Sequence, residues 1–260
     1  MALSLKTKNE ISQLLIEAVK NKLKEYKPET AYAPFHHRLL GKDRYAMFSF
    51  IQSMNTTFGM SIWEQVAVIL AKRANYKADR QYKLLGEIDN DTDTFIRDTH
   101  HKLREGKIAV NKEKEIEQIR KIIKKGKANE DPDSIVDLFV NIKGVENYFD
   151  ITSVKPNIKE FVALKLKLLR WTALRLSQDN NVAVFTRLAI AYNPYYPEPY
   201  ERWTLKGLYD LARGEILVGE EFWNFVAGDD IYKDLLDVFQ EAGKKLRPEI
   251  DKRFVKFRKV

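Results

Sequence analysis

The spacing of apolar residues changes character about half-way along the chain. In residues 9–26 apolar side chains recur every three or four positions, and this spacing predicts an amphipathic helix that Pro28 ends. Helices are predicted in the same way over 43–58, from Ser61 to about Arg73, over 89–105 and over 112–125, with a loop or short turn over 31–42. The first 130 residues are therefore expected to be mainly helical.

Short apolar runs rich in β-forming residues follow. Residues 135–140 (IVDLFV) and 147–154 (NYFDITSV) predict two strands, and the turn residues around Gly144 predict a hairpin between them. Pro156 ends the second strand, and a capping pair of Asn157 and Glu160 predicts the start of a helix over 158–177. The pattern is completed by a buried strand over 182–191, a loop over 192–200 and helices around 203–211 and 232–242.

This order of elements predicts one α/β domain in which a small mixed β-sheet is flanked by helices on both sides. We expect a mainly helical part over 1–130, the sheet core over 131–200 and a second helical part over 201–260. Hydrophobic residues make up 44% of the chain, which is enough for a full core. No apolar run reaches the roughly 18 residues that a membrane helix needs, so no membrane partner is expected.

The amino-acid composition limits the kinds of active site that the chain can have. The chain has no cysteine, which excludes disulfides, thiolate zinc sites and a cysteine nucleophile. Because the first ten residues also lack the apolar segment of a signal peptide, a cytoplasmic location is expected. The formal net charge is +8, and basic runs over 112–127, 155–175 and from Lys244 onward contrast with an acidic stretch over 209–241. This segregation favours a nucleic-acid partner, although each run alone is also typical of a solvated helix face.

Two aspartates interrupt the strands of the predicted hairpin. Asp137 lies within IVDLFV and Asp150 within YFDITSV. A carboxylate inside an apolar strand must be paired, protonated or bound to a metal, because a lone buried charge is unfavourable. The short turn can bring the two together, and two carboxylates without thiols or clustered histidines form a hard oxygen site that suits Mg²⁺. The alternative is that both aspartates point to solvent at the edge of the sheet.

Four longer segments resemble the TdeIII/MjaII family of type II restriction endonucleases, in the same order over nearly the whole chain. They are residues 27–67, 136–161, 187–203 and 220–243, and within them two aspartates followed by a nearby lysine resemble the PD-(D/E)xK nuclease core. The resemblance implies a restriction-endonuclease-like fold and Mg²⁺-dependent cleavage of double-stranded DNA at a short palindrome, for this family GGNCC. A palindrome presents two symmetry-related phosphates, so a homodimer is expected. A cognate DNA methyltransferase is expected in the same system.

The resemblance also implies roles for particular residues. Asp137 and Asp150 would hold the metal ion, and Glu64 is a second-rank ligand whose alternative is an exposed helix residue. The motif lysine belongs two residues after Asp150, where this chain has Thr152. Lys155 is the next basic candidate to orient or deprotonate the attacking water. The alternatives are that Lys155 contacts a phosphate and that Thr152 only holds a water.

DNA contacts are expected from polar residues of the first helical part and of the last predicted strand and loop. Arginine commonly pairs with guanine, and Asn or Gln with adenine, although a phosphate contact is the more frequent use of each. The candidates are Arg38, Lys42, Arg44, Gln52, Asn55, Arg187 and Asn193. Two alternative functions stay open, a DNA-binding protein that has lost catalysis and a nuclease that acts on RNA or branched DNA.

Overall fold

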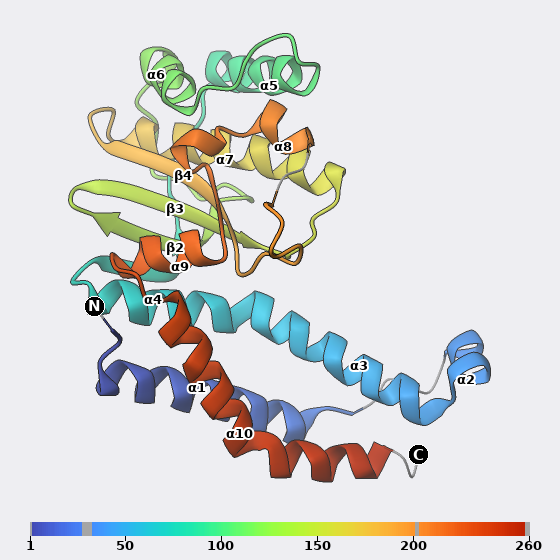
Figure 1. Ribbon diagram of the computed structural model, residues 1–260. Coiled ribbons are helices and arrows are strands. Elements are labelled where there is room, and N and C mark those ends of the chain that lie inside the picture. The colour runs from blue at the N-terminus through green and yellow to red at the C-terminus, as the bar shows by residue number, and fades with distance from the viewer. Residues whose placement is uncertain (1, 28–32, 201–202, 258–260) are drawn as a thin grey trace. The chain divides into compact units, whose positions relative to one another are not determined.

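The computed structural model describes residues 2–27, 33–200 and 203–257, which are shown in Figure 1. The chain forms two compact units. The helical unit comprises Met1–Ile69 and Asp229–Val260, and the sheet unit comprises Leu70–Gly228. Within the described ranges, no helix combines the length and the apolar character needed to cross a membrane.

The helical unit is built on two long helices that run in the same general direction. α1 (Leu5–Glu25) begins at Ser4, whose side chain accepts the Thr7 amide, and α10 (Tyr232–Phe257) packs along it. Lys8 pairs with Asp234 near the beginning of both helices. Side chains of α1, α10 and α3 (Lys42–Thr57) form the core of this unit, among them Val19, Leu23, Ala46, Phe50 and Leu246.

The chain after α1 is more helical than the sequence predicts. Part of the predicted loop over 31–42 forms α2 (Pro34–Leu40), while residues 31 and 32 lie outside the described residues. Pro34 occupies the start of α2, where proline's missing amide hydrogen is not needed. A π-helical turn, η1 (Phe58–Ile62), continues α3 into α4 (Trp63–Arg73). The predicted helix cap at Ser61 is therefore wrong, because Ser61 lies inside a continuous helical run.

The sheet has five strands in the order β1-β2-β3-β4-β5. β2 (Ile135–Ile142) and β3 (Val145–Thr152) form the predicted antiparallel hairpin, and the positive φ angles of Lys143 and Gly144 fit its two-residue turn. β4 (Ala183–Ile190) pairs in parallel with β3. Two further strands were not predicted from the sequence, namely β1 (Lys77–Lys83), an antiparallel partner of β2, and β5 (Ile216–Val218), a parallel partner of β4.

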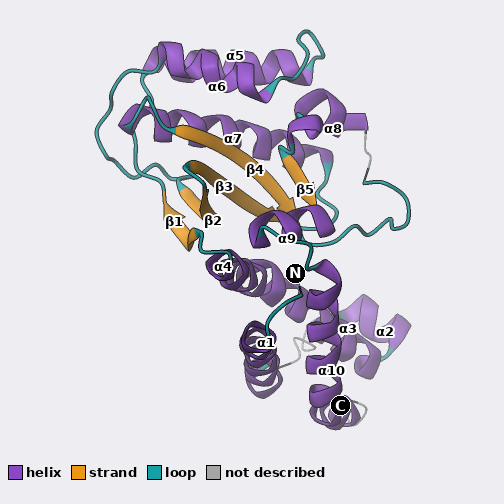
Figure 2. Ribbon diagram, turned by 60° about the vertical axis from the view of Figure 1, so that its left-hand side comes forward, coloured by secondary structure: helices purple, strands orange, loops and turns teal. Residues whose placement is uncertain are grey.

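Helices cover both faces of the sheet, as Figure 2 shows. α7 (Ile158–Gln178) begins at the predicted capping box of Asn157 and Glu160, and it crosses one face to connect β3 with β4. α5 (Asn90–Arg104) and α6 (Lys112–Ile122) pack on the outer side of α7. α9 (Glu220–Ala227) packs on the other face, where its Phe222 ring contacts Phe149.

Two short elements complete the sheet unit, α8 (Trp203–Leu208) and the 3-10 helix η2 (Leu211–Arg213). The helix predicted around 232–242 is present as α10, which extends much further, to Phe257. α9 was not predicted as a helix. The predicted fold class, a small mixed sheet flanked by helices, is confirmed.

Candidate active site

The ladder between β2 and β3 ends at the level of the two aspartates. Paired residues reach Leu138 and Phe149, and the next pair in this register would be Asp137 with Asp150. In place of that pair, the Asp137 side chain accepts the Ile151 amide, with 2.7 Å between Oδ2 and the nitrogen. Because the side chain takes an amide that a regular ladder would use, the strands part here. The hairpin thus brings the two predicted carboxylates together.

The two carboxylates repel each other. Burial and the neighbouring charge of Asp150 raise the pKa of Asp137 to about 6, while the Ile151 amide and Lys167 act in the opposite direction. Asp150 is only 7% exposed. Water therefore screens this repulsion poorly, and the pair has a net negative charge even with Lys167 beside it.

A lysine from α7 lies beside the pair. Lys167 Nζ is 2.6 Å from Asp150 Oδ2, and the same ammonium lies over the Trp171 ring, 4.8 Å from its centroid. Lys155 follows the end of β3 at Thr152, is exposed, and lies over the Tyr195 ring, 5.1 Å from its centroid. Among the described residues, Lys155 makes no contact with either carboxylate.

The sequence pattern indicates Lys167 only as part of a basic run, although the sequence also contains a signal for its position beside Asp150. The helix that connects two parallel neighbouring strands packs back on their sheet. Lys167 precedes Trp171 by about one helical turn, and Trp171 is fully buried. A lysine on the buried side of this helix therefore reaches the sheet face that carries Asp150.

One strained backbone position lies beside Asp137. Gln81 of β1 has a φ of 48°, and the β1–β2 ladder is interrupted at Gln81, at the level of Asp137. A left-handed backbone is unfavourable for a residue with a Cβ atom. The left-handed conformation of Gln81 breaks the alternation of side-chain direction along β1. The next residue, Tyr82, stacks on Phe139 with 4.7 Å between ring centroids. Both ladders that flank Asp137 are thus interrupted at this residue, which is typical of a functional site.

The donor set fits a hard divalent cation. Mg²⁺ is usually bound through one or two carboxylates and keeps several waters. Asp137 and Asp150 each have a second oxygen, Oδ1, that makes no hydrogen bond within the described residues. In that part of the chain, no group of three or more His, Asp or Glu side chains is arranged to hold a metal ion. The pair therefore offers two protein ligands and an excess of negative charge.

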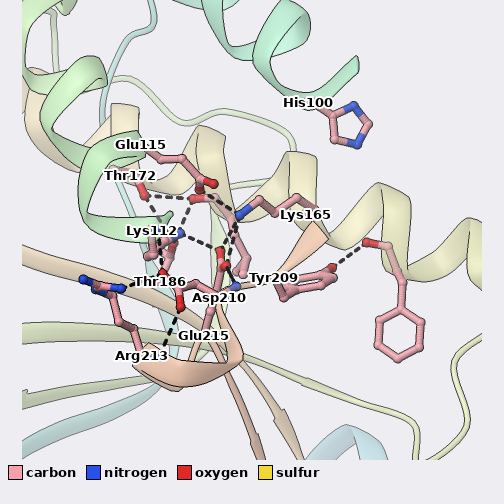
Figure 3. A network of polar contacts seen from close by, with 12 residues as sticks. His100, Lys112, Glu115, Lys165, Thr172, Thr186, Tyr209, Asp210, Arg213 and Glu215 are labelled. Carbon is pink, nitrogen blue, oxygen red and sulfur yellow. Dashed lines mark hydrogen bonds and ion pairs between the residues drawn. The ribbon is translucent and has the colours of Figure 1, made fainter. Parts of the chain in front are cut away.

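A second group of buried charges lies against the same helix (Figure 3). The Lys165 ammonium is 2.7 Å from a Glu115 oxygen and 2.8 Å from a Glu215 oxygen, and the Lys112 ammonium is 3.0 Å from Glu215. Lys112 also donates to the Thr186 hydroxyl of β4, at 2.7 Å. We call Lys112, Glu115, Lys165 and Glu215 the ion network. Its two lysines oppose two glutamates, so its charge is balanced within the protein.

The pKa values in the ion network reflect this balance. Burial acts to raise the pKa of Glu215, but attraction to Lys112 and Lys165 overrides burial and the pKa lies below its usual value. Burial dominates at Glu115, whose pKa is raised although Lys165 acts against the rise. The network joins α6, α7, β4 and the loop before β5, and it therefore fixes the position of α7 on the sheet.

Arg187, a predicted DNA-binding residue, is buried in the sheet unit. Its Nε donates to Asn147 Oδ1 at 3.0 Å, and its Nη1 donates to the backbone carbonyls of residues 213–214. The guanidinium lies between the Phe185 and Phe225 rings, 3.9 Å and 4.7 Å from their centroids, and burial lowers its pKa to about 10. These contacts account for Arg187 without DNA.

The remaining predicted residues have different surroundings. Asn193 closes its own loop, because its side chain donates to the Glu198 carbonyl at 2.7 Å and accepts the Tyr195 amide at 2.9 Å. Glu64 belongs to the helical unit, is buried and stands in the first turn of α4. The other candidates are exposed on α2 and α3, namely Arg38, Lys42, Arg44, Gln52 and Asn55.

Comparisons with known proteins match this chain to one class of protein. A family model described as "Type II restriction endonuclease, HinfI" matches residues 3–243. The type II restriction enzyme HgiCII of Herpetosiphon aurantiacus is 26% identical over 231 residues, which cover 85% of this chain and 81% of the relative. HgiEI of the same organism is 26% identical over 229 residues, with the same shares covered. No solved structure matches the chain significantly.

The fold is a mixed sheet with helices on both faces, and two carboxylates lie where its central hairpin opens. This arrangement is consistent with a nuclease of the restriction-endonuclease-like fold. The matched relatives are type II restriction enzymes. The chain belongs to the HinfI family of type II restriction endonucleases. Members of this class act on double-stranded DNA within restriction–modification systems and generally use Mg²⁺. The predicted class is confirmed, and the narrower TdeIII/MjaII assignment stays a prediction.

Proposed function

We propose that this chain hydrolyses phosphodiester bonds of double-stranded DNA in a Mg²⁺-dependent reaction centred on Asp137 and Asp150. The observation that carries the proposal is the meeting of these carboxylates where β2 and β3 part, with Lys167 Nζ 2.6 Å from Asp150. When bound to the two carboxylates, Mg²⁺ supplies positive charge that stabilises the negative charge developing on the phosphate oxygens. The family match supports the reaction class.

The side chains around the pair have separate tasks in this proposal. The Ile151 amide fixes the Asp137 carboxylate, and Lys167 fixes the Asp150 carboxylate through a charge-assisted hydrogen bond. Because Lys167 Nζ is 2.6 Å from Asp150, a water held by Asp150 would lie within its reach, and Lys167 is our preferred group for orienting the attacking water. Lys155 or Thr152 in that role is the alternative that the PD-(D/E)xK resemblance implies.

The finer expectations concern DNA recognition and assembly. The resemblance to the TdeIII/MjaII family supports a short palindrome as the target, with GGNCC as the expected sequence. The exposed polar residues of α2 and α3 would contact the DNA, and Glu64 would be a further metal ligand. A palindrome supports a homodimer with one carboxylate site on each strand. A cognate DNA methyltransferase would protect the host's own sites in the cytoplasm.

Digestion of a plasmid of known sequence in Mg²⁺ tests the proposal. We expect discrete fragments whose ends share one short palindrome, and no fragments when Mg²⁺ is removed by a chelator. Sequencing of the fragment ends gives the recognition site and the cut position directly. Absence of cutting in Mg²⁺ and in Mn²⁺, with a folded protein, would contradict the proposal.

The second candidate function is a DNA-binding protein that has lost catalysis. Thr152 at the position of the motif lysine favours this alternative. It predicts sequence-specific binding in Ca²⁺ together with an absence of cutting in Mg²⁺. Cleavage by the wild-type protein that is lost in Lys167→Ala would exclude it and would assign the lysine to α7.

A further inference from the structure

Two short segments of the helical unit are strongly basic. Residues 20–27 and 244–255 contain nine basic and three acidic residues, a net charge of +6 against +8 for the whole chain. The second half of α10 runs along the end of α1, and Lys20 Nζ lies 2.8 Å from Glu249, so the two segments lie side by side (Figure 1). We call these two segments the basic end.

Helix dipoles explain only a small part of this concentration. A basic residue stabilises the C-terminal end of a helix, but the effect falls off within the last turn. Lys22 and Lys24 occupy the last turn of α1. Lys244 and Lys245 lie more than three turns before the end of α10 at Phe257. The basic end therefore has more positive charge than the stability of its helices requires.

A groove of about 480 Å³ separates the two helices at the basic end. The residues that line it are Lys20, Leu23, Lys24, Glu249, Lys252 and Arg253. Lys20 neutralises the single carboxylate, Glu249. For Lys24 and Lys252, no ion pair is found within residues 2–27, 33–200 and 203–257, and both side chains are exposed. The groove thus keeps a positive charge that nothing in the described chain balances.

The spacing of the lysines suits a regular polyanion. Lys20 and Lys24 are four residues apart and therefore lie on one side of α1, and Lys27 follows just beyond the end of the helix. Four residues of helix span about 6 Å. One strand of duplex DNA presents a phosphate about every 3.4 Å along its axis, so Lys20 and Lys24 can face about two phosphates. Lysine binds such phosphates as a point charge and reads no base.

We propose that the basic end is a sequence-independent binding surface for the phosphate backbone of duplex DNA. The choice of DNA as the polyanion rests on the proposed function. The location of the surface rests on the charge and geometry of α1 and α10 alone. A surface of this kind binds DNA without regard to sequence, and its affinity falls steeply with salt.

The test compares two double variants of the same two helices. Lys24→Gln/Lys252→Gln removes two charges from the basic end, and Lys6→Gln/Lys233→Gln removes two exposed charges from the first turns of α1 and α10. Fluorescence anisotropy measures binding of the full chain to a labelled duplex without the palindrome, in Ca²⁺ and over a range of salt concentrations. Thermal unfolding checks that all proteins are folded, which exposed substitutions should leave nearly unchanged.

We expect the basic-end variant to lower the slope of log affinity against log salt by about 2, since each lost phosphate contact removes about 0.9. Its affinity in 0.1 M salt should fall by roughly ten- to a hundredfold. The control variant should keep the wild-type slope. Equal slopes for the two variants would overturn the inference, as would tighter binding of the basic end to anionic phospholipid vesicles or to single-stranded RNA than to the duplex.

The outcomes also separate this inference from the proposed function. If the wild-type protein binds no duplex and cuts no plasmid, the proposed function fails and takes the inference with it. If it cuts at a palindrome while both double variants keep the wild-type salt dependence, the basic end alone fails.

Discussion

Two sets of charged groups contact α7 on the same side of the sheet, and they are built on opposite principles. In the ion network two lysines face two glutamates, and Lys165 contacts both carboxylates within 3.0 Å. In the carboxylate site two aspartates share one lysine, which contacts only Asp150. A buried set that is balanced in itself needs no ligand, whereas a set with excess charge is stabilised by a cation.

The pKa values of Glu215 and Asp137 express the same difference, although burial raises the pKa of Glu115 in the ion network too. The lysines of the ion network hold the pKa of Glu215 below its usual value against the effect of burial. Burial and the charge of Asp150 raise the pKa of Asp137 to about 6. Complete burial is therefore compatible with a stable charge when partners are supplied. We infer that the carboxylate site serves the proposed function and that the ion network belongs to the scaffold that positions it.

The largest expected effect is on catalysis at the carboxylate site, Asp137 and Asp150. Asp150→Ala removes one of the two proposed metal ligands, and we expect cleavage to slow by at least about 10⁴-fold, or ~5.5 kcal/mol in the barrier. The measurement is the rate of plasmid cleavage in Mg²⁺. Asp98→Ala, at an exposed aspartate of α5, is the matched control and should cut at nearly the wild-type rate. Equal rates for the two variants would remove Asp150 from the site.

The second expected effect is on the free energy of unfolding, through the ion network. Lys165→Met leaves Glu115 and Glu215 with one lysine fewer in a buried place, and the free energy of unfolding should fall by about 3–5 kcal/mol. Urea unfolding measures this change. The exposed Lys114→Met of α6 is the control and should cost less than about 0.5 kcal/mol. A small cost at Lys165 would mean that the network does not hold α7.

These two sets also show what the sequence could and could not predict. The hairpin and its two aspartates were predictable, because strand alternation and turn chemistry are local properties. The capping box of α7 was predictable for the same reason. The partner of Asp150 was not, since Lys167 is 17 residues away and its position depends on how α7 crosses the sheet. The buried contacts of Arg187 likewise come from packing, which no local pattern encodes.

The missed strands have a physical reason too. β1 (KADRQYK) has one buried residue, Ala78, and its alternation breaks at the left-handed Gln81, so it lacks the apolar period of a strand. β5 has only three residues, fewer than a periodic pattern needs. Edge strands are paired on one side only, and in β1 the exposed positions are charged or polar, which is common at edges. The central strands, covered on both faces, were the predictable ones.

The third prediction concerns which lysine belongs to the carboxylates. Lys167→Ala removes the cation beside Asp150, and we expect cleavage to slow by about 10²-fold or more, as loss of a group that orients or transfers protons does. Lys155→Ala should change the rate by less than about threefold, since Lys155 lies over Tyr195. Single-turnover cleavage of a short duplex measures both. The reverse order of effects would support the lysine position implied by the PD-(D/E)xK resemblance.

The smallest expected effect is a gain in stability where the other substitutions cause losses. It tests the excess negative charge of the carboxylate site. The pKa of Asp137 is raised from 3.8 to about 6 in the folded protein, so the folded state binds more protons than the unfolded state between these values. Stability then falls as pH rises through this window and stays lower above it. Asp137→Asn removes the charge and keeps an oxygen that can accept the Ile151 amide. In a chelator at pH 8 we expect this variant to be more stable than the wild-type protein.

The expected gain is about 1–2 kcal/mol, less than the ~3 kcal/mol that two pKa units correspond to, because part of the side chain is exposed to water. Urea unfolding at pH 8 and at pH 4 measures it. At pH 4 the gain should nearly vanish, since Asp137 is then protonated in the folded state. Added Mg²⁺ should stabilise only the wild-type protein, because the variant has lost a ligand. A variant that is less stable than the wild type at pH 8 would show that Asp137 is held as a structural charge, like those of the ion network.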